Sequence, residues 1–317
     1  MGAERVLVLG ANGFIGSHLV DMLASHGHEV VAFDRFDLAP VRFTARTASI
    51  LSGDFLNAGD LRQALIGATS VVHLVSSTTP ATAEQDPLSD IEQNLEGSVR
   101  LLEYCAGTPT VKRVVFSSSG GTVYGDVPSP MSELSITQPI SPYGICKLAV
   151  EHYLRFFSVT SNLQSVALRI ANPYGEGQPL GRKQGVIPIF VENALAGRPV
   201  VVYDDGSMVR DYLYVTDVAA AITLLVEASR PQYDTYNIGS GVGHSVNDIL
   251  ASVEAALGRP VETVHKDSPK SYVKSSVLDT TRVVGEFGWR PQVSLEDGVR
   301  RTVEYVHTAL NTPRSGH

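Results

Sequence analysis

A short apolar run that ends in three evenly spaced glycines constrains the fold of this chain more than any other feature. The run is Arg5–Leu9, and the glycines are Gly10, Gly13 and Gly16. From Phe14 onwards apolar residues recur at helical spacing, so we expect a strand, a tight turn and a helix. Such glycines let the backbone approach a pyrophosphate, which the free N–H groups at the helix N-terminus can hold. The spacing is G-x-x-G-x-x-G rather than the commoner G-x-G-x-x-G, and a simple tight turn is the alternative.

The next apolar run ends in a carboxylate that suits the same ligand. Glu29–Phe33 leads into Asp34, 18 residues after Gly16. A carboxylate at this place accepts both ribose hydroxyls of NAD and repels the 2′-phosphate of NADP, although the neighbouring Arg35 weakens that discrimination. Asp34 behind the glycine turn therefore predicts a dinucleotide site with NAD as the cofactor.

Strands and helical patterns alternate regularly as far as about residue 175. Apolar strands are predicted at 71–75, 111–116 and 166–170, and helical patterns at 90–106 and 143–157. This alternation is typical of α/β proteins, so we predict a Rossmann-type, doubly wound parallel sheet with ligands at its carboxyl edge. His73, within the first of these strands, is expected to be a satisfied interior histidine.

The composition and the hydrophobic pattern of the sequence change near residue 175. Glycine and proline become frequent and the apolar runs become shorter. We predict an NAD-binding domain over residues 1–175 and a smaller C-terminal α/β substrate domain over residues 176–317. Parts of 210–240 are expected to pack back on the first domain.

Composition and charge exclude several classes of function. The chain has 317 residues and a net charge of −8, which argues against binding to nucleic acids or to anionic membranes. No apolar run reaches the roughly 18 residues of a transmembrane helix. The two cysteines and nine histidines stand in no metal-binding spacing. Without a disulfide framework or a secretory signal, we expect a cytoplasmic protein and no metal.

Tyr143 and Lys147 place a phenol and an ammonium on one face of a predicted helix. Residues four apart on a helix have Cβ atoms roughly 5–6 Å apart. Tyrosine, with a pKa of about 10, is a poor base near neutrality unless a positive charge stabilises its anion. Lys147 or a cationic nicotinamide could supply that charge. On its own the pair is also compatible with packing and solvation of an ordinary amphipathic helix.

Two further polar segments are candidates for a site. Ser117–Gly125 follows the predicted strand 111–116 and would bring hydroxyl groups to the carboxyl edge of the sheet, although such strings are also ordinary loops. Arg210 could donate two parallel hydrogen bonds to a phosphate, or it could form a surface pair with Asp211.

In their order along the chain, these motifs resemble the extended short-chain dehydrogenase/reductase family. The resemblance runs from about residue 4 to residue 308. Within the family the chain is most similar to the NAD-dependent nucleotide-sugar epimerase and dehydratase group, notably the UDP-galactose (UDP-glucose) 4-epimerases. The motifs that carry the resemblance are Gly10-x-x-Gly13-x-x-Gly16, Asp34, Asp54, Ser117–Gly125, Tyr143-x-x-x-Lys147, Asn172-Pro-Tyr-Gly and Arg210-Asp-Tyr.

The resemblance implies epimerisation of a UDP-sugar at carbon 4 through a transient 4-keto sugar, with NAD as the cofactor. Tyr143 would be the base, Lys147 would stabilise its phenolate, and Ser119 would bond to the reacting oxygen. The implied cofactor-binding residues are Gly10, Gly13, Phe14, Ile15, Gly16, Asp34, Asp54, Tyr143 and Lys147. The implied substrate-binding residues are Ser119, Asn172, Arg210, Tyr212 and Lys270. The helices 90–106 and 143–157 resemble those that form a four-helix dimer interface in the family, so a homodimer is expected.

The chain departs from the family pattern at three places. The hydroxyl loop has one residue more than the usual Ser-Ser-Ser-Ala-Thr-Val-Tyr-Gly form, so Ser118 or Thr122 could take the catalytic role. Cys146 stands where the family commonly has serine. Pro269 stands where the family has a second phosphate-binding arginine, so Lys270 is the expected substitute.

Substrate size is predicted from one position. In family 4-epimerases the residue three before the aspartate of the Ser-Val-Leu-Asp segment acts as a size gate beside the sugar 2-substituent, and here it is Ser276. A small gate leaves room for an N-acetyl group. We therefore expect UDP-N-acetylhexosamines to be accepted as well as UDP-glucose and UDP-galactose.

Other functions on the same fold remain alternatives. Family dehydratases carry an Asp-Glu pair and decarboxylases a Glu before Val-Tyr-Gly, whereas this chain has Gly120-Gly121-Thr122, which favours epimerisation. A 4-keto-sugar reductase would consume reduced cofactor. A non-catalytic NAD-binding or redox-sensing protein would tend to lose the Tyr or the Lys, and both are present here.

Overall fold

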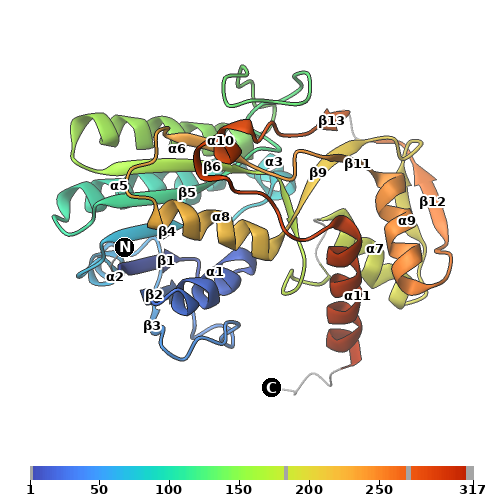
Figure 1. The fold of residues 1–317 in the computed structure, drawn as a ribbon, viewed down its shortest axis with the longest axis horizontal. Helices are drawn as coiled ribbons and strands as arrows, with labels where there is room; N and C mark the ends of the chain where they lie inside the picture. The colour runs from blue at the N-terminus through green and yellow to red at the C-terminus, as the bar shows by residue number, and fades with distance from the viewer. Residues whose placement is uncertain (1–2, 182–184, 269–272, 312–317) are drawn as a thin grey trace.

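A seven-stranded parallel sheet forms the centre of the molecule (Figure 1). The computed structural model describes residues 3–181, 185–268 and 273–311. The strand order is β10-β6-β5-β4-β1-β2-β3. The strands are β1 (Arg5–Leu9), β2 (Glu29–Asp34), β3 (Ser49–Ser52), β4 (Ser70–His73), β5 (Arg113–Ser119), β6 (Gln164–Ile170) and β10 (Thr235–Ile238). The predicted Rossmann-type, doubly wound sheet is confirmed.

Helices cover both faces of this sheet because its strands are apolar on both sides. Along β1, Val6 and Val8 belong to one hydrophobic cluster, and Leu7 and Leu9 to the other. The first cluster lies under α1 (Phe14–Ser25), α8 (Val215–Glu227) and α10 (Thr281–Phe287). The second lies under α2 (Ala58–Ala64), α5 (Gly97–Gly107) and α6 (Pro142–Thr160). Within the described part of the chain, no helix has the length and apolar character needed to cross a membrane.

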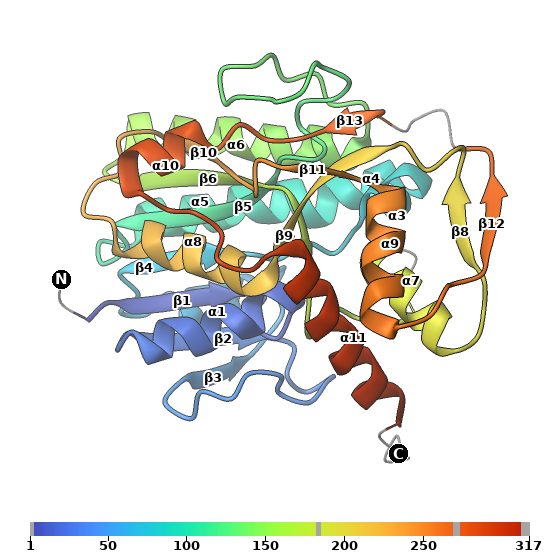
Figure 2. The ribbon, with the colours of Figure 1, turned by 45° about the vertical axis from the view of Figure 1, so that its right-hand side comes forward.

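The C-terminal half builds a smaller unit beside the carboxyl edge of the sheet (Figure 2). Its strands are β7 (Asn172–Tyr174), β9 (Val209–Tyr214), β11 (Gly243–Ser245) and β13 (Ser275–Ser276) in one sheet, and β8 (Val200–Tyr203) and β12 (Thr263–Lys266) in another. Its helices are α7 (Val186–Leu195), α9 (Val246–Leu257) and α11 (Leu295–Asn311). Within 210–240, α8 packs on α1 and β10 pairs with β6. The domain boundary at 175/176 stays a prediction.

The sequence predicts one helix at 90–106, whereas the structure has three consecutive helical elements there. The segment contains the end of α4 (Pro87–Asp90), a π-helix η1 (Ile91–Glu96) and α5, and α3 (Pro80–Gln85) precedes it. The apolar spacing predicts a helix but does not reveal its wider central turn, because a π turn depends on contacts with other segments. The expected strands and the helix at 143–157 are present with shifted ends.

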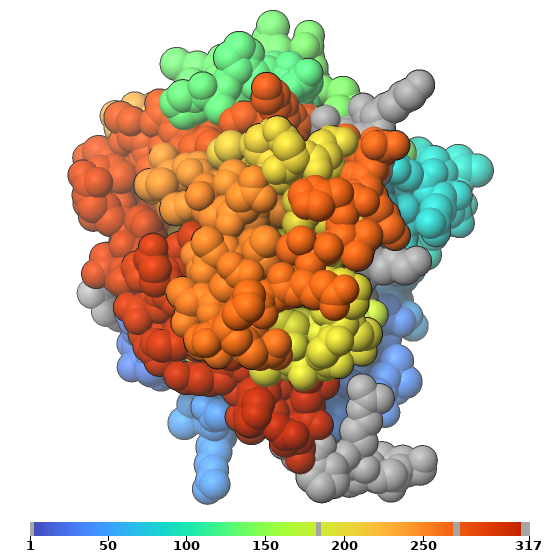
Figure 3. All heavy atoms as spheres, turned by 90° about the vertical axis from the view of Figure 1, so that its right-hand side faces the viewer, coloured from blue at the N-terminus to red at the C-terminus, as the bar shows by residue number. Residues whose placement is uncertain are grey.

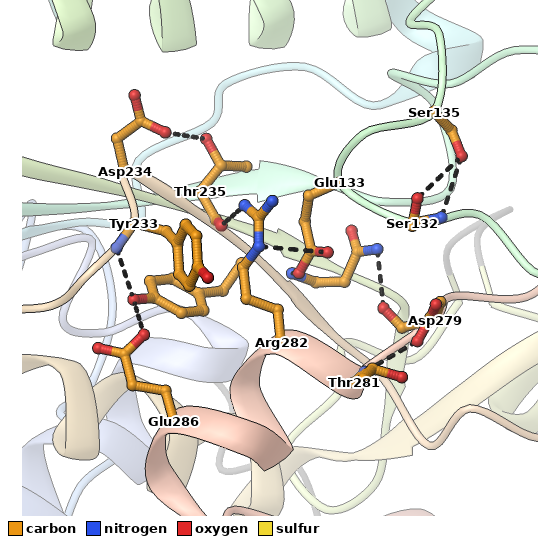
Figure 4. Close-up of polar contacts among 12 residues, drawn as sticks. Ser132, Glu133, Ser135, Tyr233, Asp234, Thr235, Asp279, Thr281, Arg282 and Glu286 are labelled. Atoms are coloured by element: carbon orange, nitrogen blue, oxygen red, sulfur yellow. Dashed lines mark hydrogen bonds and ion pairs between the residues drawn. The ribbon is translucent and has the colours of Figure 1, made fainter.

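An irregular segment, residues 126–140, lies between β5 and α6 and is anchored on β10 and α10. It forms the green ridge at the top of the face in Figure 3. Figure 4 shows part of its anchor, in which Glu133 lies 3.6 Å from the Arg282 guanidinium. Glu133 also accepts a 2.8 Å bond from the Asn237 N–H. Arg282 in turn donates to the Thr235 carbonyl oxygen at 2.7 Å. This anchor fixes the chain that enters α6, where Tyr143 and Lys147 lie.

Candidate active site

The glycine turn has the shape of a phosphate cradle. Gly10 has φ +83°, a conformation that favours glycine, and its N–H donates to the Phe33 carbonyl oxygen at 3.0 Å. A Cβ added at Gly16 would overlap the Gly10 carbonyl oxygen, and one at Gly13 would lie 3.0 Å from it. The backbone therefore leaves no room for a side chain at Gly16 and little at Gly13. These residues fit the pyrophosphate of a dinucleotide.

Asp34 lies against this turn, as the sequence predicts. Its two carboxylate oxygens accept bonds from the N–H groups of Asn12 (2.9 Å) and Arg35 (2.8 Å). These bonds orient the carboxylate beside the turn, where it fits a ribose. Asp54 follows the neighbouring strand β3 and is exposed. Phe14 and Ile15, at the start of α1, lie partly buried against the hydrophobic cluster of the C-terminal unit.

We expect Gly16→Ala to weaken NAD binding at least about tenfold, because the added methyl group must push α1 away from the Gly10 carbonyl. Overpacking of this kind typically also costs about 1–3 kcal/mol of stability. Titration of NAD followed by calorimetry measures the affinity. Gly285→Ala in α10 is the matched control, since its Cβ meets open space. Equal NAD affinity in both variants would contradict a tight cradle.

Tyr143 and Lys147 lie together in the first two turns of α6. Ser141 caps the helix by accepting a 3.2 Å bond from the Gly144 N–H, and Pro142 occupies the first turn. Lys147 is 7% exposed; its Nζ donates to the Ser117 carbonyl oxygen at 2.9 Å and lies 5.5 Å from the centre of the Tyr143 ring. The predicted common face is confirmed, and it points to the carboxyl end of β5.

The protonation of this pair is set by burial. Burial raises the pKa of Tyr143 to about 12; a hydrogen bond with Ser76 opposes the rise, and the Asp90 charge adds to it. Burial lowers the pKa of Lys147 to about 8, and the Asp90 charge is the largest influence that opposes this fall. The phenol is therefore neutral at pH 7 in the protein alone. A further positive charge beside it, such as a nicotinamide cation, would favour the phenolate.

The three candidate hydroxyls differ in their contacts. The Ser118 hydroxyl donates to the buried Glu151 carboxylate and is thereby occupied. Ser119 is the last residue of β5, and Thr122 Oγ1 is buried with no hydrogen-bond partner among the described residues. Ser119 and Thr122 therefore remain the candidates for a bond to substrate.

The predicted substrate residues lie side by side in the C-terminal unit. Asn172 of β7 pairs with Tyr212 of β9, and Ser276 of β13 pairs with Arg210. Asn172, Arg210 and Tyr212 line one open pocket with residues of α7 and β8. The alternative prediction, an Arg210–Asp211 pair on the surface, is wrong. Asp211 is fully buried, and its carboxylate accepts hydrogen bonds from the backbone N–H groups of residues 240 and 241. Lys270 lies outside the described residues.

Sequence reasoning found some interior residues and missed others. His73 is 2% exposed and its Nε2 is bonded to the Ser98 hydroxyl at 2.8 Å, which confirms the interior position. Its Nδ1 is buried with no hydrogen-bond partner among the described residues, so the expectation of a fully satisfied histidine is wrong. Burial lowers the pKa of His73 to about 3. The pocket walls from α7 and β8, including Phe190 and Tyr203, were not predicted.

Asp90 was predicted only as the start of a helix. A carboxylate within an apolar helical pattern was a sequence signal that could have marked it as a buried functional residue.

Comparison with known proteins agrees with this geometry. A model of the NAD-dependent epimerase/dehydratase family matches residues 6–239. The UDP-glucose 4-epimerase of Mycolicibacterium smegmatis is 36% identical over 310 residues, covering 95% of this chain and 98% of the relative. The dTDP-4-dehydro-6-deoxyglucose reductase of Escherichia coli is 30% identical over 310 residues, covering 95% and 97%.

A solved structure extends the likeness to the fold. The UDP-glucose 4-epimerase of Thermotoga maritima, described with UDP-glucose, is 36% identical with a TM-score of 0.90, covering 97% of this chain and 100% of that chain. These matches confirm the family resemblance that the motifs indicate. They also confirm NAD as the cofactor of the family. The chain belongs to the NAD-dependent epimerase/dehydratase family.

Proposed function

We propose that this protein epimerises UDP-sugars at carbon 4 through a transient 4-keto sugar. The observation that carries the proposal is the position of Tyr143 and Lys147. They lie at the carboxyl edge that also holds the glycine turn and Asp34, and β7 and β9 lead from that edge to the pocket with Asn172 and Arg210. A base between a dinucleotide site and a pocket with a phosphate-binding side chain suits a redox step on a nucleotide sugar.

Each residue of the site has a proposed role. Tyr143 removes the proton from the sugar 4-hydroxyl and later returns it to the same oxygen, after hydride has been restored to the opposite face of carbon 4, a general-base role that typically contributes about 10²–10⁴-fold in rate. Bound NAD⁺ supplies a hydride acceptor that is regenerated in each cycle. Lys147 stabilises the phenolate, and Ser119 or Thr122 bonds to the reacting oxygen.

Binding roles divide between the two halves. Gly10, Gly13, Gly16 and Asp34 hold the dinucleotide, with Phe14, Ile15 and Asp54 beside it. Asn172, Arg210, Tyr212 and Lys270 hold the nucleotide diphosphate. We assign the dinucleotide to residues 1–175 and the nucleotide sugar mainly to residues 176–317, with Asn172 of β7 contributing from just before that boundary.

A 4-keto-sugar reductase is the second candidate, because a dTDP-4-dehydro-6-deoxyglucose reductase is among the relatives. A dehydratase or decarboxylase is less favoured, since Gly120-Gly121-Thr122 supplies no additional acid or base. Incubating the purified protein with UDP-galactose, without added cofactor, separates these functions. An epimerase converts it to UDP-glucose without net cofactor change, whereas a reductase requires a keto sugar and oxidises one reduced cofactor per turnover. Absence of UDP-glucose would contradict the proposal.

Ser276→Tyr should lower turnover of UDP-N-acetylgalactosamine relative to UDP-galactose. Ser276 is 5% exposed and pairs with Arg210, so a large side chain there intrudes on the sugar site beside the phosphate-binding residue. Chromatographic assay of both substrates gives the ratio of their rates. Ser275→Tyr is the control, because adjacent strand residues point to opposite faces. An unchanged ratio in Ser276→Tyr would remove Ser276 as a size gate.

We further propose that the protein is a cytoplasmic homodimer formed through α5 and α6. Ile145, Phe156 and Val159 of α6 are 54%, 54% and 78% exposed, which leaves an apolar surface of the kind that dimers bury. The two cysteines are buried and free, which suits a reducing compartment. Light scattering on the purified protein tests the dimer.

A further inference from the structure

A buried carboxylate lies directly behind the proposed base. Asp90 ends α4, where the chain enters the π-helix, and it is 0% exposed. Its Oδ1 accepts bonds from the Thr78 hydroxyl and from Asn94 Nδ2 (2.7 Å). Among the described residues, no N–H or O–H group donates to its Oδ2, which is also buried. One oxygen is therefore held in place while the other has no such donor.

The carboxylate forms one wall of a small cavity next to the site. Tyr143, Cys146 and Lys147 of α6 line the same cavity, with apolar walls from Val75 and Phe116. The Lys147 ammonium lies 4.7 Å from the centre of the Phe116 ring and bonds to the Ser117 carbonyl oxygen. Apart from Asp90, the side chains that line the cavity with Lys147 are apolar or carry no charge at pH 7. A charged group in such surroundings is costly unless an opposite charge is near.

Asp90 is the carboxylate that can balance this charge. Glu151 also faces Lys147, but it accepts bonds from Arg169 (2.7 Å) and from the Ser118 hydroxyl, so its charge is already paired. His73 is neutral near pH 7, since burial lowers its pKa to about 3. Burial also raises the pKa of the Cys146 thiol to about 12, with the hydrogen bond and charge of Asp90 adding to the rise, so the thiol is uncharged.

We propose that Asp90 is a positioning residue that serves as the counter-ion of Lys147 and keeps its ammonium group charged beside Tyr143. This inference rests on the proposed function, because the charged ammonium matters for stabilising the phenolate. Asp90 does not touch the substrate; it acts through Lys147. The bonds from Thr78 and Asn94 fix the carboxylate at the cavity wall. Asp90 and Asn94 are four residues apart along the helical chain, so their side chains meet on one face.

The carboxylate affects both members of the pair in the same direction. Its negative charge opposes the fall in the pKa of Lys147 and contributes to the rise in the pKa of Tyr143. Without that charge both values fall. Lys147 then loses its proton at lower pH, and Tyr143 reaches its phenolate at lower pH. The whole pH profile of turnover should therefore move to lower pH. A fall in the maximal rate without such a shift is not expected.

Asp90→Asn tests this, because it keeps an oxygen for the bonds from Thr78 and Asn94 and removes the charge. NMR titration of labelled lysine, with the Lys147 signal assigned by its loss in Lys147→Met, should give a value near 8 in the wild type. In Asp90→Asn it should lie about one pH unit or more lower, as expected when a close opposite charge is removed. Both limbs of the kcat profile should shift in the same direction.

Cys146→Ser is the matched control, since it alters the same cavity wall at an uncharged group, keeps a hydrogen-bond donor beside Asp90 and should leave both titrations in place. A folded Asp90→Asn with an unchanged Lys147 titration would overturn the proposal, and a fall in kcat at every pH without a shift would indicate a structural role. Asp90→Ser, which is smaller, replaces it if the Asn variant does not fold. The NMR titration needs no substrate, so it is decisive even if the UDP-galactose assay contradicts the proposed function.

Discussion

Tyr143→Phe should reduce epimerisation by about three orders of magnitude, within the 10²–10⁴-fold range of a lost general base. The variant keeps the ring that packs at the start of α6 and removes only the hydroxyl that would take the substrate proton. Lys147 keeps its bond to the Ser117 carbonyl oxygen, so the fold and bound NAD should be retained. Turnover of UDP-galactose, and NAD released on denaturation, measure the two properties separately.

Tyr153→Phe gives the matched control, because it makes the same chemical change on the same helix at a side chain that is 41% exposed. It should turn over at the wild-type rate. Wild-type turnover in Tyr143→Phe would exclude Tyr143 as the base, whereas loss of NAD together with turnover would point to a structural or cofactor-binding role.

The parts of the site that the sequence predicts are those fixed by local spacing. The glycine turn follows from a strand, three glycines and a helix within one short stretch, and Asp34 follows at the end of the next strand. Tyr143 and Lys147 share a face because α6 is an ordinary α-helix between its cap and Lys147. Alternation of strands and helices was enough to predict the parallel sheet.

The parts that escaped prediction depend on contacts between distant segments. Asp90 is a buried wall of the cavity because α6 supplies the facing wall and because Thr78, 12 positions earlier in the chain, bonds to its carboxylate. Ser118 is removed from the catalytic candidates by Glu151, which lies 33 positions further along the chain. No periodicity reveals such pairings, since they appear only when the sheet brings its strand ends together.

Arg169→Met should lower the melting temperature by roughly 6 °C. Arg169 and Glu151 have side chains that are 8% and 7% exposed, and a 2.7 Å bond joins Nη2 to Oε2. Removing the guanidinium leaves a buried carboxylate without its cation, which typically costs about 3–5 kcal/mol. In a chain of 317 residues each kcal/mol corresponds to about 1.5 °C. Thermal unfolding followed by circular dichroism measures the change.

The Arg169–Glu151 pair also supports the candidate site, so its loss should lower the rate of turnover as well as the stability. Glu151 accepts the Ser118 hydroxyl, and the Arg169 guanidinium lies 4.8 Å from the centre of the Tyr124 ring, at the two ends of the hydroxyl loop. Arg300→Met is the control for losing an arginine, because Arg300 lies in an exposed pair on α11 that solvent screens. The double variant Glu151→Leu, Arg169→Met should melt at a higher temperature than Arg169→Met alone, since no unpaired buried charge remains. If the double variant were the less stable of the two, the cost would lie in lost packing rather than in the uncompensated carboxylate, and the electrostatic account of this pair would be wrong.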